Sequence, residues 1–139
     1  MTDTAADTGK SLAGVKVMVI DDSNTIRRSA EIFLLQAGAT VILAEDGFDA
    51  LAKIADYLPE VVFVDIMMPR LDGYQTCALI KKNPKFAGTP VVMLSSKDGL
   101  FDRARGRMVG SDEYLTKPFT KDSLLKTVSA HVRGAAAGS

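Results

Sequence analysis

The sequence predicts an α/β fold, a doubly wound (βα)5 domain built on a five-stranded parallel sheet. Short, continuous apolar runs alternate five times along the chain with segments of helical periodicity. Continuous apolar runs of this length are typical of strands that are buried on both faces of a parallel sheet. The link between each run and the next helical segment is short, which favours parallel strands joined by right-handed crossovers. Ligands of such folds bind outside the carboxyl ends of the strands.

Each predicted strand is a short apolar run bounded by polar or turn-forming residues. The last run, Glu-Tyr-Leu, is too short to be identified by its periodicity, and we predict it from its place in the alternation. The five predicted strands are residues 15–20, 40–44, 61–64, 91–94 and 113–115.

The predicted helices carry apolar residues at spacings of three and four, which gives each helix one apolar face. In the second helix, Phe48, Leu51, Ala52 and Ala55 are predicted to face the core, and Asp46 is the candidate N-cap. The five predicted helices are residues 23–36, 47–57, 74–82, 100–108 and 120–131.

Length and composition indicate one globular domain. The chain has 139 residues, of which 47% are hydrophobic and 24% charged, and its 17 basic and 17 acidic side chains cancel. This balance argues against a nucleic-acid-binding protein. No apolar run approaches the ~20 residues of a membrane helix, and no signal peptide is recognisable. A single cysteine, Cys77, excludes an internal disulfide. We predict a cytoplasmic protein with one domain at residues 14–133 and flexible tails at 1–13 and 134–139.

Polar side chains follow the predicted strands at the edge where ligands are expected. Asp21 and Asp22 follow the first strand, Asp65 the third, Ser95 the fourth, and Lys117 the fifth. Taken singly, Asp22 could cap a helix and Lys117 could be a surface lysine. An unpartnered carboxylate at the border of the core is costly, so Asp65 is the strongest single candidate. Random surface polarity would not gather at one edge, and the joint placement therefore predicts a functional site.

Metal-assisted phosphoryl transfer is the chemistry that fits these residue types. Clustered carboxylates repel one another and need a cation, and hard oxygen ligands beside a phosphate suit Mg²⁺. One carboxylate could attack phosphorus to form an acyl phosphate. A lysine and a hydroxyl group could then hold the phosphoryl oxygens and neutralise the developing charge.

Four motifs resemble the receiver domain of two-component response regulators. In chain order they are VMVIDDS, FVDIMMPRLDGY, VVMLSS and YLTKPFT. The resemblance implies the flavodoxin-like strand order 2-1-3-4-5 of CheY-like receivers. It also implies that Asp65 is the phosphoacceptor, and that Mg²⁺ is held by Asp21, Asp22, Asp65 and the backbone carbonyl of Met67.

The same resemblance implies the remaining roles. Lys117 and Ser95 would bind the phosphoryl group, Ser95 and Tyr114 would be the switch residues, and the peptide bond before Pro118 would be cis. The expected partners are a histidine kinase or phosphotransfer protein and a downstream protein effector, with neither nucleic acid nor membrane insertion. Such a protein is not an enzyme in the usual sense, because it catalyses only its own phosphorylation and dephosphorylation.

A closer resemblance connects the chain with the stand-alone, PilG-type receivers of type IV pilus twitching motility. Two segments carry it, FVDIMMPRLDGYQTCALIK and SSKDGLFDRARGRMVGSDEYLTKPFT. Receivers of flagellar chemotaxis share most of these residues, so both systems stay open. Since no output domain is evident, the output is expected to come through protein binding. Three arginines on the fourth helix, Arg103, Arg105 and Arg107, are either a docking site or simply solvated.

Two alternatives from other functional classes compete with this interpretation. One is a phosphatase with an aspartate nucleophile, as in the haloacid dehalogenase class, but that class has Asp-x-Asp after its first strand, where this chain has Asp21-Asp22. The other is a flavodoxin-like nucleotide-binding module. No glycine-rich phosphate loop follows any predicted strand, which counts against it.

Overall fold

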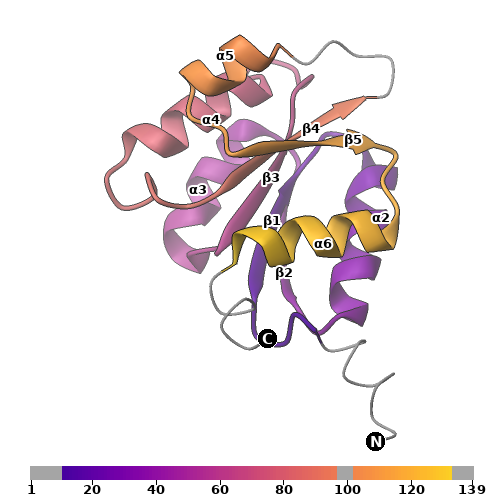
Figure 1. The fold of residues 1–139 in the computed structure, drawn as a ribbon. Coiled ribbons are helices and arrows are strands. Elements are labelled where there is room, and N and C mark those ends of the chain that lie inside the picture. Colours follow the sequence, from indigo (N-terminus) through magenta and orange to yellow (C-terminus); the bar gives the residue numbers. More distant parts are fainter. Residues whose placement is uncertain (1–10, 97–101, 133–139) are drawn as a thin grey trace, which may run out of the picture.

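A computed structural model describes residues 11–96 and 102–132 of the chain. Its centre is a parallel sheet of five strands in the order β2-β1-β3-β4-β5 (Figure 1), which confirms the predicted fold class and strand order. The strands and helices are β1 (Lys16–Ile20), α2 (Asn24–Gln36), β2 (Thr40–Ala44), α3 (Gly47–Tyr57), β3 (Val61–Asp65), α4 (Gly73–Lys82), β4 (Val91–Ser96), α5 (Arg103–Met108), β5 (Glu113–Lys117) and α6 (Lys121–His131).

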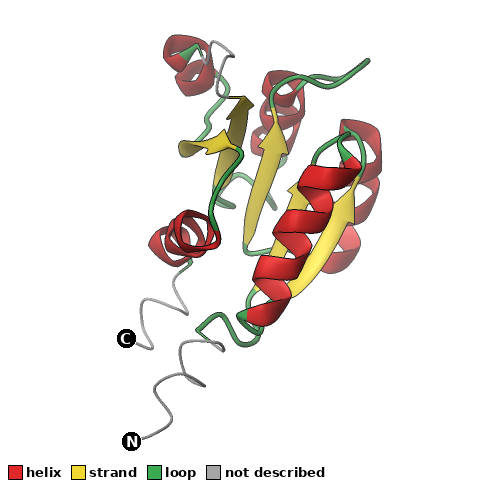
Figure 2. Ribbon diagram, turned by 90° about the vertical axis from the view of Figure 1, so that its right-hand side faces the viewer, coloured by secondary structure: helices red, strands yellow, loops and turns green. Residues whose placement is uncertain are grey.

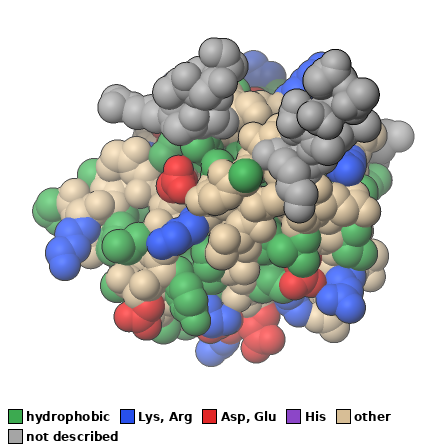
Figure 3. All heavy atoms as spheres, turned by 90° about the horizontal axis from the view of Figure 1, so that it is seen from below, with side chains coloured by type: hydrophobic (Ala, Val, Ile, Leu, Met, Phe, Trp, Pro, Cys, Tyr) green, Lys and Arg blue, Asp and Glu red, His purple; other side chains and the backbone are tan. Residues whose placement is uncertain are grey.

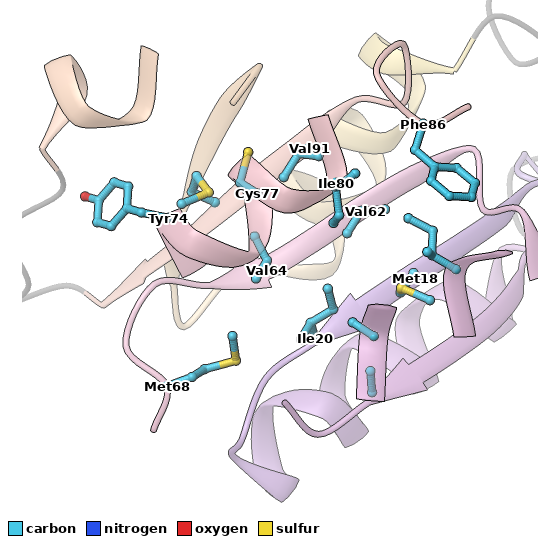
Figure 4. Close-up of a cluster of buried hydrophobic side chains, with 14 of the residues drawn as sticks. Met18, Ile20, Val62, Val64, Met68, Tyr74, Cys77, Ile80, Phe86 and Val91 are labelled. Atoms are coloured by element: carbon cyan, nitrogen blue, oxygen red, sulfur yellow. The ribbon is translucent and has the colours of Figure 1, made fainter. Parts of the chain in front are cut away.

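Helices cover both faces of the sheet, as Figures 1 and 2 show. Alternate residues along each strand point to opposite faces, which creates two apolar cores. One core lies beneath α2 and α6 and includes Val19, Phe63 and Leu124. The other lies beneath α3 and α4 and includes Val64 and Ile80 (Figure 4). The central strands are therefore apolar throughout, until the chain reaches the carboxyl edge of the sheet.

Side-chain caps fix where the helices begin. Asp46 accepts a hydrogen bond from the backbone N–H of Asp49 at 2.7 Å, and Thr120 accepts one from Ser123 N at 3.0 Å. Helix α2 is capped by Ser23. Because Ser23 supplies the cap oxygen, the carboxylate of Asp22 is not used for this purpose.

The predicted inner face of α3 is correct for Leu51, which packs against the core, and wrong for the other three residues. Ala52 and Ala55 are exposed, and Phe48 is 54% exposed, beneath the guanidinium of Arg70 at 5.2 Å from its ring centre. Helix α3 instead buries Gly47, Ala50 and Ile54, and its first residue packs closely against Leu71 and against Thr76 of α4. A Cβ on Gly47 would lie 2.7 Å from the Leu71 side chain, so a larger residue does not fit there.

The predicted N-terminal tail ends too late. Leu12 has no exposed surface and packs in the core beneath α2 and α6, and its N–H donates to Ala37 O at 2.9 Å. An isolated leucine in a polar stretch has no periodic pattern, so the sequence alone did not indicate this contact. Residues 1–10, the predicted tail at 134–139 and the start of the predicted helix at 100–108 lie outside the described residues.

The described helices contain no segment with the length and apolar character needed to cross a membrane. Lysine and arginine side chains alternate with aspartate and glutamate on the surface that Figure 3 views from below, without a patch of one sign. This pattern agrees with the balanced charge of the sequence.

Candidate functional site

The carboxyl edge of the sheet brings Asp21, Asp65 and Lys117 together. Asp21 follows β1, Asp65 is the last residue of β3, and Lys117 is the last residue of β5. By strand alternation the three side chains share the sheet face that carries α2 and α6. Asp21 is fully buried and Asp65 is 3% exposed.

Lys117 bridges the two buried carboxylates. Its Nζ lies 3.0 Å from Asp65 Oδ1 and 3.2 Å from Asp21 Oδ2. Backbone N–H groups complete the hydrogen bonds, since Ser23 N donates to Asp21 Oδ1 at 2.9 Å and Met67 N donates to Asp65 Oδ1 at 3.3 Å. The predicted cluster is thus formed from three separate strands.

Asp22 adds a third carboxylate at the exposed rim of this cluster. Each of Asp21, Asp22 and Asp65 offers one carboxylate oxygen, and these oxygens lie within 4.8 Å of one another. Three carboxylates and one ammonium group leave a surplus of negative charge. Such an arrangement of hard oxygen atoms fits a divalent cation such as Mg²⁺.

The electrostatics of the cluster reflect this surplus. Burial, reinforced by the charge of Asp21, raises the pKa of Asp65 from 3.8 to about 7, and the hydrogen bond from Lys117 offsets only part of the rise. Burial alone would lower the pKa of Lys117, but its hydrogen bond to Asp65 and the charge of Asp21 raise it above its ordinary value. The lysine therefore stays charged, whereas ionisation of Asp65 is opposed.

Gly73 supports the backbone of Asp65, a role that the sequence patterns did not reveal. It is the first residue of α4, and its N–H donates to Ile66 O at 2.9 Å. A Cβ at this position would contact the carbonyl oxygen of Asp65 and lie 2.7 Å from Ile66 Cα. Only glycine lets α4 begin directly against the strand end. The Asp72-Gly73 dipeptide is the sequence feature that could have indicated this role of Gly73.

Ser95 and Tyr114 lie near the cluster but on the other face of the sheet. Register pairs Ser95 with Thr116 and Met93 with Tyr114, and Tyr114 packs against the core beneath α3 and α4. The Ser95 hydroxyl donates to Ser96 O at 3.4 Å. Within the described residues, no hydrogen bond joins Ser95 to Asp65 or Lys117.

A family model described as the response regulator receiver domain matches residues 17–129. The chain belongs to this family. The match begins at the second residue of β1 and runs beyond β5. It includes Asp21, Asp22, Asp65 and Lys117, which we call the carboxylate–lysine cluster. This assignment favours neither the phosphatase nor the nucleotide-binding alternative.

The receiver resembles both curated proteins and solved structures. It is 71% identical over 119 residues to Protein PilG of Pseudomonas aeruginosa, a match that covers 86% of this chain and 88% of that protein. It is 37% identical to Response regulator MprA of Mycobacterium sp., covering 86% of this chain and 51% of that protein. The structure of chemotaxis protein CheY4 from Vibrio cholerae has a TM-score of 0.81 at 32% identity, covering 86% of this chain and all of that one.

The cis peptide bond between Lys117 and Pro118, expected from the receiver resemblance, is present. Cys77, which stood apart from the predicted site, is buried in α4, and burial raises the pKa of its thiol to about 11. A thiol with so high a pKa is a poor nucleophile. Cys77 is therefore a packing residue of the receiver.

Proposed function

We propose that this receiver accepts a phosphoryl group on Asp65 from a histidine kinase or phosphotransfer protein. The observation that carries the proposal is the buried Asp65 carboxylate at the open edge of the sheet, held by Lys117 at 3.0 Å. A carboxylate oxygen of Asp65 forms a bond to phosphorus while the bond from phosphorus to the donor histidine nitrogen breaks. The histidine nitrogen leaves with the bonding electron pair, and a proton on the other ring nitrogen of the phosphohistidine makes the leaving group a neutral imidazole.

Lys117 contributes electrostatic stabilisation to this transfer. It already lies between Asp21 and Asp65, so little reorganisation is needed for its ammonium group to meet the phosphoryl oxygens. Preoriented charge of this kind is more effective in a partly buried site than in water. Lys117 thus orients the acceptor before transfer and neutralises charge during it.

The acidic cluster fits Mg²⁺, which we assign to Asp21, Asp22, Asp65 and the backbone carbonyl of Met67. The three carboxylate oxygens within 4.8 Å support the first three assignments, and the receiver resemblance supports the fourth. When bound, Mg²⁺ would neutralise the charge that accumulates on the transferring phosphoryl group. The Met67 side chain is 75% exposed, so only the backbone of this residue would take part in the site.

Mg²⁺ is expected to stabilise the folded receiver, because the unfolded chain lacks the cluster. At ten times the dissociation constant the gain is about RT ln 11, or ~1.4 kcal/mol. For a domain of this size the melting temperature should rise by roughly 3–6 °C. Thermal unfolding with and without Mg²⁺ measures the effect. Asp22→Ala should reduce the rise in melting temperature that Mg²⁺ causes. Asp122→Ala, an exposed control on α6, should show the same rise as wild type. Equal rises in both variants would contradict the assignment.

We infer that Ser95 reports the phosphoryl group to the far face of the sheet. Ser95 is the penultimate residue of β4, one residue beyond Leu94, the partner of Asp65, and it shares a face with Tyr114. Its hydroxyl now donates to Ser96 O, at the long distance of 3.4 Å. Exchange of this weak bond for one to a charged phosphoryl oxygen would move the β4 end and change the space around Tyr114.

Ser95→Ala should keep phosphoryl uptake but uncouple Tyr114 from it. A hydrogen bond to a charged group contributes about 1.5–3 kcal/mol, enough to shift a two-state equilibrium by one to two decades. The chain has three tyrosines, so ring resonances can be followed individually by NMR. Acetyl phosphate with Mg²⁺ should move the Tyr114 signal in wild type and in Ser96→Ala, the neighbouring control. A full shift in Ser95→Ala would mean that the switch lies elsewhere.

The output is proposed to be a phosphorylation-dependent protein contact in pilus control. The likeness to PilG over most of both chains supports this assignment, and chemotaxis-like control is the second candidate because CheY4 shares the fold. In this role the protein catalyses only its own phosphorylation and dephosphorylation. The cytoplasmic location and the absence of nucleic-acid binding rest on the sequence and stay predictions.

The direct test is uptake of one phosphoryl group. The protein is incubated with Mg²⁺ and acetyl phosphate, and intact-mass measurement should find a single adduct. The adduct should survive acid and be lost in base, as acyl phosphates are. Continuous release of phosphate from small phosphate esters, without an adduct, would instead support a phosphatase.

A further inference from the structure

Tyr74, the second residue of α4, joins the start of α4 to the start of α5. Its ring is 5% exposed and belongs to the apolar core beneath α3 and α4 (Figure 4). Its hydroxyl oxygen accepts a hydrogen bond from the backbone N–H of Asp102 at 2.9 Å. Asp102 is the N-cap of α5, and its carboxylate accepts a hydrogen bond from Arg105 N at 3.0 Å. One tyrosine hydroxyl group therefore holds the residue at which α5 begins.

Arg105 makes a second contact between the same two helices. Its guanidinium carbon lies 4.3 Å from the centre of the Tyr74 ring, and its Nη2 lies 3.6 Å from Oδ2 of Asp72. A cation above an aromatic ring is attracted by the negative face of that ring. Asp72 is itself the N-cap of α4. The first turns of α4 and α5 are thus connected by both an aromatic side chain and an ion pair.

Helix α5 has little apolar surface to hold it in place by other means. It is six residues long, and Gly106 is the one residue of this helix that is buried. Met108 is 86% exposed. The segment that follows α5 is held separately, because Asp112 accepts a hydrogen bond from Lys81 Nζ at 2.9 Å. An element with few buried apolar contacts is readily displaced, so the contacts of Tyr74 have a large share in fixing the start of α5.

Tyr74 also directly follows the glycine that contacts the phosphoacceptor strand. Gly73 N donates to Ile66 O at 2.9 Å, and a Cβ on Gly73 would contact the backbone oxygen of Asp65. The start of α4 therefore cannot shift without a change at the end of β3. A continuous series of contacts leads from Asp65 through Gly73 and Tyr74 to Asp102, and it includes neither of the two proposed switch residues.

We propose that Tyr74 is a positioning residue that restrains α5 and thereby opposes the phosphorylated state of the receiver. The inference rests on the proposed phosphoryl-acceptor function. The contacts of Tyr74 belong to the arrangement in which Ser95 donates to Ser96 O. The chain leads from β4 to α5, so a shift of the β4 end draws on the start of α5, which Tyr74 resists. By linkage, loss of this restraint and a phosphoryl group on Asp65 favour each other.

Hydrogen exchange, measured by NMR on the full chain with Mg²⁺, tests the restraint. Tyr74→Phe keeps the buried ring and removes only the hydroxyl group. The N–H of Gly106, which donates to Asp102 O at 2.9 Å in the first turn of α5, should exchange about three- to tenfold faster, because one supporting hydrogen bond is lost. The matched control is Tyr57→Phe, which removes the hydroxyl group of a half-exposed tyrosine on α3. It should exchange as wild type does.

The affinity for beryllofluoride, a non-covalent mimic of the phosphoryl group, tests the effect on the switch. In the presence of Mg²⁺ it should rise about three- to tenfold in Tyr74→Phe and stay unchanged in Tyr57→Phe, because the mimic no longer works against the restraint. Arg105→Gln should also raise the affinity. Arg28→Gln, which removes an exposed arginine from α2, should bind the mimic as wild type does.

Three results would overturn the proposal. Unchanged exchange at Gly106 in Tyr74→Phe would mean that the hydroxyl group does not restrain α5. Faster exchange with an unchanged affinity would leave Tyr74 a structural contact only, and a lower affinity would mean that it supports the phosphorylated state. Phosphoryl uptake from acetyl phosphate is measured in parallel by intact mass. If wild type neither gains a phosphoryl group nor binds the mimic, the receiver function itself is refuted; with normal uptake, only the inference is.

Discussion

Asp65→Asn is expected to abolish phosphoryl acceptance. The amide is not nucleophilic enough to attack phosphorus. Asp21 is also buried and also contacts Lys117, but its two oxygens are both engaged, one by Ser23 N and the other by Lys117, whereas Lys117 and Met67 N both contact the same oxygen of Asp65. Wild type treated with acetyl phosphate and Mg²⁺ should gain one phosphoryl group in intact mass, and the variant none. The loss should be essentially complete, because the covalent step itself is removed.

The matched control is Asp122→Asn, which removes the same charge from an exposed position on α6. It should accept the phosphoryl group as wild type does. Labelling of Asp65→Asn at the wild-type level would transfer the acceptor role to another carboxylate, with Asp21 and Asp22 the first to be tested.

The metal-free receiver is expected to lose stability as the pH rises from about 4 to about 7, because of Asp65. The folded protein raises the pKa of this carboxyl from 3.8 to about 7, so the folded state binds the proton more tightly than the unfolded chain does. The stability from this proton is full below the unfolded pKa and disappears as the pH passes the folded pKa. A pKa difference of this size corresponds to at most ~4 kcal/mol.

Asp65→Asn should remove this pH dependence and leave the metal-free protein more stable than wild type above pH 7. Urea unfolding in a metal chelator, at several values of pH between 5 and 8, measures the free energy of unfolding of both proteins. The difference in the free energy of unfolding between Asp65→Asn and wild type should increase with pH. It should decrease when Mg²⁺ replaces the chelator, because the cation neutralises the same charges. A gap that is constant with pH would show that Asp65 does not titrate in this range.

The apolar runs by themselves determined the sheet. Burial on both faces requires continuous apolar strands, and this pattern is local to each strand and independent of what packs on it. The same runs place Asp21, Asp65, Ser95 and Lys117 at strand ends, because each polar residue marks where a buried strand stops. The identity of the carboxyl edge as the site follows from strand direction alone. Helix caps such as Asp46 were equally local and were predicted.

Packing over long sequence separations decided the rest. Lys117 contacts Asp21 across 96 residues and Asp65 across 52, and only the folded sheet sets these distances and the pKa of Asp65. Tertiary packing also buries Leu12 and exposes Phe48. The path of the N-terminal segment and the rotation of α3 about its axis both depend on the elements that pack against them. Tertiary structure also places Ser95 and Tyr114 on the face of the sheet opposite the carboxylates. Side chains alternate between the two faces along each strand, but the sequence does not specify the register between neighbouring strands. The sequence determined which groups reach the edge, whereas tertiary structure decided which of them meet.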